Sequence, residues 1–236
     1  MKKNLLIATA IAATSVFAFD SNEIALKAVD VTSYKAHGRM LLAIPFDGYG
    51  TASGGNIAIA DVLLTDTLAA GDKIYLPKSE AGKYDEYTLS NDKTTWTASR
   101  VVDVTSGSIQ ETTGTPASEA TIQRGKAFWL QSSATDVKLL GQAASQTTAS
   151  VSASAGYQLL APTTSENDIL ISSLAGETGD LVILANGTRY QKTSKSDAGN
   201  GWRNVADRNT VIGASDKIPA GVGFWYKAGG SRTLSL

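Results

Sequence analysis

The sequence contains no cysteine and only one histidine, and this scarcity excludes several kinds of chemistry. Without thiols the chain can form no disulfide and can use no cysteine nucleophile. The lone His37 and the missing cysteines leave a zinc ion without its usual ligands. No Gly-x-Ser-x-Gly elbow accompanies His37, so a structural role for it is favoured over a triad. We therefore expect no catalytic residue, no bound metal and no cofactor.

Long apolar runs and a strong net charge are also missing. Beyond Ala18 nothing approaches the roughly 18 consecutive apolar residues that a membrane span needs. The formal net charge is only −1, and no basic cluster occurs. Nucleic-acid partners are usually met by a basic patch or stripe. We expect no transmembrane segment after leader cleavage and no nucleic-acid partner.

The first 18 residues have the pattern of a signal peptide. A basic start (Met1–Lys3) precedes an apolar run (Leu5–Ala13), and the small residues Val16 and Ala18 follow at the spacing that a signal peptidase recognises. We predict cleavage after Ala18. The mature protein is then exported, to the periplasm, the medium or the cell surface.

Against these absences, the chain carries the same short motifs twice and in the same order. Ile-x-x-Gly-x-x-Phe-Trp occurs at 122–129 and 218–225, and Gly-Asp before an apolar run occurs at 71–76 and 179–184. Gly-x-x-Leu-Leu-Ala occurs at 38–43 and 156–161, and Trp96 and Trp202 hold matching places between the other motifs. The repeated positions with a structural role are Gly71, Asp72, Gly125, Phe128, Trp129, Gly179, Asp180, Gly221, Phe224 and Trp225. Four ordered matches indicate an internal duplication.

The motifs and the composition predict an all-β fold of two tandem units, residues 24–142 and 143–236, packed together. Each is expected to be a small antiparallel sandwich or barrel. Neighbouring residues on a strand face opposite sides, so one aromatic of each Phe-Trp pair should face the other unit. The Gly-Asp pairs should form turns in which the carboxylate accepts backbone N–H bonds. Asn186-Gly187 predicts a hairpin with a type I′ turn, and Ile218–Lys227 reads as one strand.

Aromatic residues are the only candidates for ligand binding. Trp96, Trp202, Tyr84 and Tyr190 could stack on sugar rings if they were exposed, although core packing is the favoured interpretation for residues that recur in both copies. A glycosidase would need two carboxylates facing each other across a cleft. The loop carboxylates that could serve are Asp47, Asp61, Asp66, Glu166 and Asp168. We expect all five to be solvated loop residues.

The pattern resembles a group of exported bacterial β-proteins. Their shared features are a signal peptide, a strand ending in Leu-x-x-Pro, a Gly-Asp strand, a lone tryptophan and a closing Gly-x-x-Phe-Trp strand. In this chain the corresponding segments are Leu41–Pro45, Gly71–Leu76, Trp96 and Gly125–Trp129, together with their second copies. The resemblance implies export and a β fold, and it implies no activity.

Together these features predict an exported, non-enzymatic structural or interaction protein of the bacterial cell envelope or extracellular matrix. Its partners would be cell-surface polymers, or other copies of itself joined through edge strands. One alternative is a carbohydrate-binding module that uses exposed Trp and Tyr. A weaker alternative is a glycoside-active enzyme.

Overall fold

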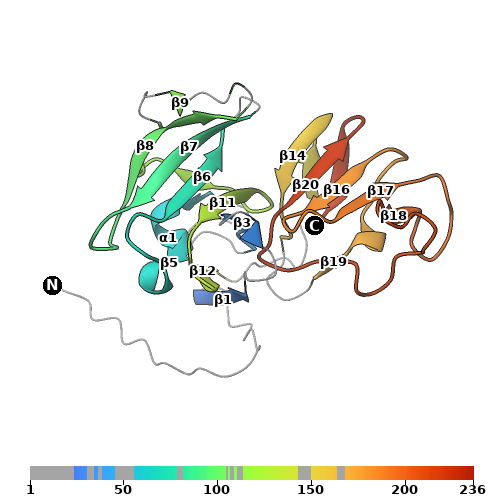
Figure 1. Cartoon of the computed structure of the whole chain (residues 1–236), viewed down its shortest axis with the longest axis horizontal. Coiled ribbons are helices and arrows are strands. Elements are labelled where there is room, and N and C mark those ends of the chain that lie inside the picture. The colour runs from blue at the N-terminus through green and yellow to red at the C-terminus, as the bar shows by residue number, and fades with distance from the viewer. Residues whose placement is uncertain are drawn as a thin grey trace.

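The computed structural model describes residues 24–30, 35–36, 39–45, 56–78, 82–104, 106, 109–110, 114–142, 150–163 and 168–236. Strands dominate this part of the chain, and every ladder between them is antiparallel, so the predicted all-β class is confirmed (Figure 1). Within the same residues, no helix has the length and apolar character that crossing a membrane requires. The predicted leader lies outside the described residues, as do His37 and Gly38.

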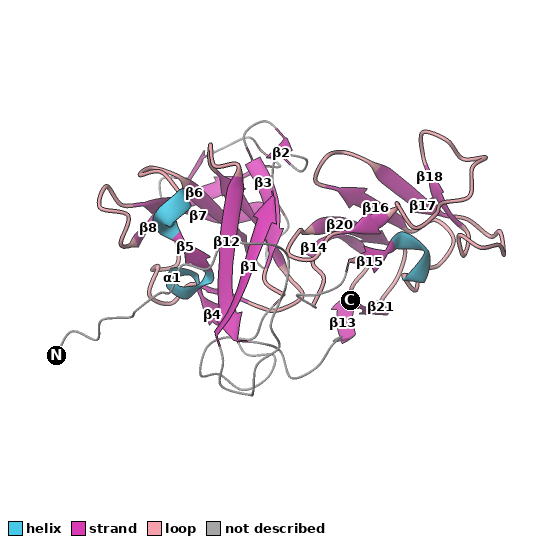
Figure 2. Ribbon diagram, turned by 90° about the horizontal axis from the view of Figure 1, so that it is seen from below, coloured by secondary structure: helices cyan, strands magenta, loops and turns pink. Residues whose placement is uncertain are grey.

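The first half, up to residue 142, is built around a seven-stranded sheet. In spatial order its strands are β2 (Lys35–Ala36), β3 (Arg39–Ala43), β11 (Ala127–Gln131), β6 (Lys73–Pro77), β7 (Lys83–Leu89), β8 (Trp96–Asp103) and β9 (Ile109–Gln110). A second sheet contains β1 (Ile24–Asp30), β12 (Asp136–Gln142) and β5 (Leu63–Leu64), and β4 (Ile57–Ala58) pairs with β10 (Thr121–Ile122). Two short helices, α1 (Ile59–Val62) and the 3-10 helix η2 (Thr65–Thr67), precede β6. Figures 1 and 2 place β1 and β12 beneath the large sheet, with α1 beside them.

The second half has a main sheet of five strands. In spatial order they are β14 (Gly156–Leu160), β20 (Phe224–Ala228), β16 (Leu181–Leu184), β17 (Arg189–Lys192) and β18 (Trp202–Asn204). Two smaller ladders join β13 (Ser150–Ala153) to β21 (Arg232–Ser235) and β15 (Ile169–Leu170) to β19 (Lys217–Ile218), and η3 (Ile171–Ser173) is a 3-10 helix. Val151 thus lies in a strand that pairs with the end of the chain.

The main sheets of the two halves have the same strand order. β3-β11-β6-β7-β8 in the first half corresponds to β14-β20-β16-β17-β18 in the second, with the repeated motifs on matching strands. Register agrees as well: Trp129 lies opposite Leu41 and Tyr75, and its motif counterpart Trp225 lies opposite Leu159 and Ile183. The small ladders β4–β10 and β15–β19 correspond in the same way, as do β1–β12 and β13–β21.

The two halves meet at a seam held by backbone hydrogen bonds. The Ala43 amide donates to the Gly221 carbonyl oxygen at 2.9 Å, and the Ala161 amide donates to the Gly125 carbonyl oxygen at 3.0 Å. Exchanging the repeated motifs converts one of these bonds into the other. Apolar side chains close the seam, because four residues of the second half belong to the buried core of the first: Leu159, Ala161, Ala185 and Val222. The halves therefore share one continuous interior at this point.

The Gly-Asp motifs form the turns that the sequence predicts. Gly71 and Gly179 adopt positive φ angles of 86° and 99°, a conformation that glycine enters without steric cost. The following carboxylates each accept a backbone N–H bond of 2.9 Å, Asp72 from Ala69 and Asp180 from Glu177.

Two local predictions need correction. Asn186-Gly187 does connect β16 to β17, but only Gly187 has a positive φ angle, so the turn is not type I′. The Asn186 side chain accepts the Thr188 amide instead, which holds a longer loop. The run from Ile218 to Lys227 is interrupted between β19 and β20, because residues 219–223 turn to meet the first half at the seam.

Candidate binding cleft

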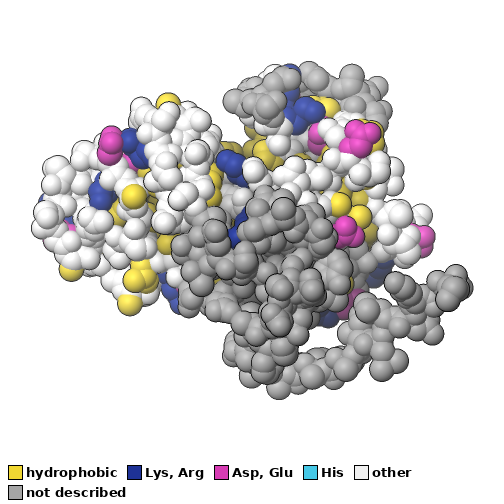
Figure 3. All heavy atoms as spheres, turned by 180° about the vertical axis from the view of Figure 1, so that it is seen from behind, with side chains coloured by type: hydrophobic (Ala, Val, Ile, Leu, Met, Phe, Trp, Pro, Cys, Tyr) yellow, Lys and Arg dark blue, Asp and Glu magenta, His cyan; other side chains and the backbone are white. Residues whose placement is uncertain are grey.

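A cleft opens between the two main sheets above the seam. Figure 1 shows the sheets diverging, and Figure 3 shows a notch with hydrophobic and basic side chains near its base. The cleft comprises two hollows of about 540 and 340 Å³, which share Tyr84 and Trp225 in their linings. Volumes of roughly 300–1,000 Å³ are typical of small-ligand sites.

One wall is the outer face of the seven-stranded sheet. Trp129 and Tyr75 are cross-strand neighbours on β11 and β6, and both line the smaller hollow. Tyr84 on β7 and Val102 on β8 are paired one row further along the same face. Burial raises the pKa of Tyr84, and a hydrogen bond with Trp129 opposes that shift. Tyr75 and Trp129 lie on one face of the sheet, and their strand neighbours Ile74 and Phe128 are fully buried on the other.

The other wall comes from the edge of the second half. On β14, Tyr157 and Leu159 point to the same side, and Leu159 lies opposite Trp225 of β20. The Tyr157 and Trp225 rings meet edge to face, with centroids 6.4 Å apart. Tyr157 keeps 56% of its surface exposed, so its ring is accessible to solvent at the cleft wall.

The two Phe-Trp pairs divide their rings as the strand geometry requires. Phe128 and Phe224 are fully buried in the cores of their own halves. Trp225 packs against the core cluster of the first half, as predicted for one aromatic of each pair, whereas Trp129 packs against the core cluster of its own half. Trp129 is also half-buried and lines the smaller hollow together with Trp225. The cleft thus has a tryptophan from each half.

The charged side chains that the structure describes in the cleft lining are all positive. Lys78, Lys83 and Lys126 line the larger hollow and Arg39 the smaller, and among the described residues that line the two hollows there is no Asp or Glu. The Arg39 guanidinium carbon lies 5.1 Å from the centre of the Tyr75 ring, within cation–π range. Lys126 is half-buried, and this burial lowers the pKa of its amine. Among the residues that the structure describes, no carboxylate pairs with Lys126.

The aromatics singled out from sequence as ligand contacts occupy other places. Trp96, Trp202, Tyr84 and Tyr190 are all buried, with exposed fractions of 6%, 0%, 7% and 5%. The Trp202 indole N–H donates to the Leu174 carbonyl oxygen at 3.1 Å, and the Tyr190 hydroxyl donates to Asp216 at 2.9 Å. These four residues therefore form no exposed stacking surface. Of the four, only Tyr84 lines the cleft, where it is shared by both hollows.

The three loop carboxylates that the structure describes do not line the cleft. Asp61 and Asp66 are on α1 and η2, and Asp66 forms an ion pair with Lys138 at 2.6 Å. Asp168 pairs with Lys217 at 2.6 Å, while Asp47 and Glu166 lie outside the described residues. Across the part of the chain that the structure describes, no three His, Asp or Glu side chains gather as metal ligands would.

Sequence reasoning missed the residues that give the cleft its character. Arg39 and Tyr157 follow the glycine of the Gly-x-x-Leu-Leu-Ala motif in the two copies, and Lys126 stands where the second copy has Val222. These are matched positions at which the copies differ in chemistry. Such differences between the copies were the signal available in the sequence.

Comparison with known proteins gives no further guide: no family model matches the chain, and neither a curated protein nor a solved structure matches it.

Proposed function

We propose that this is an exported, non-enzymatic interaction protein of the bacterial cell envelope or extracellular matrix, and that it holds its partner in the cleft between the halves. The observation that carries the proposal is the convergence of Trp129 and Trp225, from different halves, on one hollow. The proposed export is supported by residues 1–18, which have the pattern of a signal peptide, and by the resemblance to exported bacterial β-proteins.

We further propose that the two halves are tandem duplicated β units, residues 24–142 and 143–236, each sandwich-like. Matching strand order, matching register and the paired seam bonds Ala43–Gly221 and Ala161–Gly125 support this origin. Duplication followed by divergence also explains why the two walls of the cleft differ in their side chains. At matched positions the first half carries Tyr75 and the second Ile183, so divergence of the copies gave each wall its own surface.

Carbohydrate binding is the second candidate, and the cleft favours it through Tyr157 and the paired tryptophans. Indole and phenol rings offer flat apolar faces to the C–H side of a sugar, while their polar atoms remain available for hydrogen bonds. The glycoside-active alternative has less support, because Asp61, Asp66 and Asp168 are not among the residues that line the cleft.

A retention experiment with two surface variants tests the proposed function. Purified protein is incubated with washed cell-envelope and extracellular-matrix fractions of the producing bacterium, and the bound fraction is measured. Tyr157→Ser should lose most of the retention, because it removes an exposed ring from the cleft wall. The control Val211→Ser removes an exposed apolar side chain that lines neither hollow, and it should bind like the wild type. Equal retention of the two variants would contradict the proposal. Hydrolysis of a polymer in the envelope or matrix fractions by the protein would also contradict it.

A further inference from the structure

We propose that the cleft binds an acidic polysaccharide, a polymer whose sugar rings lie against the aromatic walls and whose carboxylates meet the basic side chains. This inference rests on the proposed function and adds the chemical class of the partner. It is carried by the coincidence of two features in one cleft, an aromatic surface and the half-buried Lys126, which forms no ion pair with a described carboxylate.

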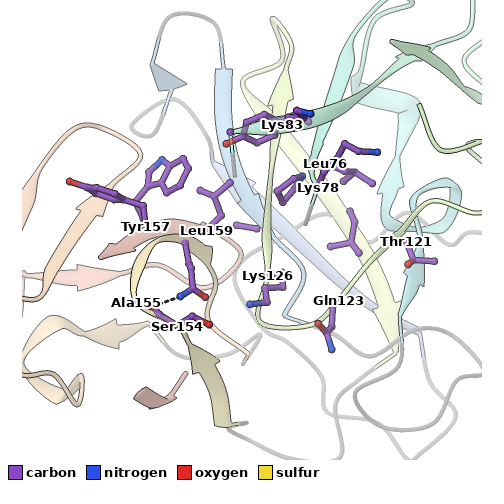
Figure 4. A pocket seen from close by; sticks show the side chains of 17 residues that line it. Leu76, Lys78, Lys83, Thr121, Gln123, Lys126, Ser154, Ala155, Tyr157 and Leu159 are labelled. Atoms are coloured by element: carbon purple, nitrogen blue, oxygen red, sulfur yellow. Dashed lines mark hydrogen bonds between the residues drawn. The ribbon is translucent and has the colours of Figure 1, made fainter. Parts of the chain in front are cut away.

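Lys126 is the centre of the charge argument. Lys126 lies immediately before β11, at the junction of the two halves. Its backbone forms an isolated β-bridge with Leu160 of β14. Figure 4 shows it between the first-half wall, with Lys78 and Lys83, and the second-half residues Ser154 and Tyr157. A half-buried ammonium without a carboxylate partner has lost part of its hydration, and an anion placed beside it would compensate that loss.

The nearby acids are already neutralised. Asp85 forms an ion pair with Lys78 at 3.1 Å and also accepts a hydrogen bond from Thr115. Glu86, on the same sheet face as Tyr75, is 2% exposed and lies between Lys73 at 3.0 Å and Arg100 at 3.1 Å. An entering anion therefore meets no unpaired carboxylate from these strands.

The remaining lining suits sugar hydroxyls. Thr121, Gln123, Ser154 and Gln158 add hydroxyl and amide groups to the larger hollow, next to the apolar Tyr157 and Trp225. Carbohydrate ligands need this mixture of apolar ring contacts and dispersed hydrogen-bond partners. At the outer rim the Lys227 amine lies 5.4 Å from the centre of the Tyr157 ring, which extends the positive charge along the wall.

Two other ligand classes fit less well. A cationic ligand would enter an aromatic hollow in which Arg39 already occupies the Tyr75 face, and none of the described lining residues is an acid that would attract it. An acidic peptide would satisfy the charge, but one common way for a peptide to bind a sheet is to add a strand to a free edge. The outer edge of β14 is already engaged at Leu160 by its bridge with Lys126.

The test uses the full mature protein with charge-matched probes. Polygalacturonate, alginate and hyaluronate are the acidic polymers, their methyl-esterified forms are the neutral counterparts, and poly-glutamate represents acidic peptides. Tryptophan fluorescence reports binding, since Trp129 and Trp225 line the cleft. We expect at least one uronate polymer to bind, its ester to bind at least about tenfold more weakly, and affinity to fall with added salt.

Substitutions of Lys126 test whether the positive charge that binds the polymer lies in the cleft. Lys126→Met should weaken uronate binding by about tenfold or more, because one charge-assisted hydrogen bond is lost. Lys126→Arg should retain binding. The control Lys195→Met removes an exposed lysine that lines neither hollow, and it should change nothing.

The possible results distinguish a failure of the acidic-polysaccharide proposal from a failure of the proposed function. If esters and acids bind equally and Tyr157→Ser abolishes both, the function stands and the acidic class is wrong. Binding of poly-glutamate alone, or retention on envelope fractions without binding of any uronate, also overturns the acidic class. If no probe binds and Tyr157→Ser leaves retention on envelope fractions unchanged, both proposals fall.

Discussion

The backbone amide of Ala43 lies 2.9 Å from the carbonyl oxygen of Gly221, and this hydrogen bond is half of a matched pair across the seam. Its counterpart joins Ala161 to Gly125 at 3.0 Å. Contacts that reappear when the partners are exchanged are the mark of an isologous interface, the kind found in two-fold dimers. Here the interface lies within one chain, and it sets the angle at which the two walls of the cleft meet.

Gly223 tests how closely the halves pack at this seam. A Cβ atom at this position would lie 2.3 Å from the Ala127 Cβ and 2.9 Å from the Leu41 Cγ. Gly223→Ala therefore forces the halves apart, and we expect a loss of about 1–3 kcal/mol in unfolding free energy, measured by urea denaturation. Gly213→Ala is the control, because its Cβ would meet nothing within 4 Å. Similar denaturation midpoints for the two variants would show that the seam is not tightly packed.

Arg124 provides a second contact between the halves. Its side chain is 7% exposed, and the guanidinium Nε donates to the Thr163 carbonyl oxygen at 2.9 Å. Arg124→Met keeps an apolar stem but leaves the buried carbonyl without this donor, so the unfolding free energy should fall by about 1–3 kcal/mol. Arg189→Met, at an exposed arginine, should stay within about 0.5 kcal/mol of the wild type. An Arg124→Met protein as stable as Arg189→Met would contradict the assigned role.

Much of the fold was predictable because the chain repeats itself. Gly71-Asp72 and Gly179-Asp180 marked matching turns, and alternation along a strand required Phe128 and Trp129 to face opposite sides. What the repeat could not supply was the break between β19 and β20. That break depends on contacts with residues far away in the sequence, and the local run of apolar residues there reads as a continuous strand.

Trp96 and Trp202 hold matching places but differ in hydrogen bonding. The Trp202 indole N–H donates to Leu174, whereas that of Trp96 has no partner among the described residues. We expect Trp202→Phe to cost about 1 kcal/mol more unfolding free energy than Trp96→Phe, since only the former loses a hydrogen bond. Thermal and urea unfolding of the two variants give the comparison. Equal losses would mean that the Trp202 bond adds no net stability.

The candidate site was harder to foresee than the fold. Recurrence of a residue in both copies pointed to Trp96 and Trp202, but recurrence reports what each core needs. The cleft depends on residues that differ between copies, such as Lys126 and Tyr157, and on the angle between the sheets. That angle follows from packing at the seam, which no local pattern encodes.

Asp180 makes stability depend on pH in the acidic range. Its carboxylate is 1% exposed, and burial alone would raise its pKa. Hydrogen bonds from Arg232, at 2.5 and 3.0 Å, and from the Tyr226 hydroxyl, at 2.6 Å, outweigh burial and lower the pKa to about 2. Backbone N–H groups of Glu177 and Gly229 add to the same effect.

An unfolded aspartate has a pKa near 3.9, so the folded state binds this proton more weakly than the unfolded state does. The stabilisation is therefore fully present above about pH 4–5 and is lost as the pH falls toward about 2, a change of roughly 2–3 kcal/mol. The measurement is the difference in unfolding free energy between the wild type and Asp180→Asn at pH 6, 4, 3 and 2. We expect that difference to shrink across this window, because the variant has no carboxylate to protonate. A difference that stays constant from pH 6 to pH 2 would show that the Asp180 carboxylate is not held ionised by Arg232 and Tyr226.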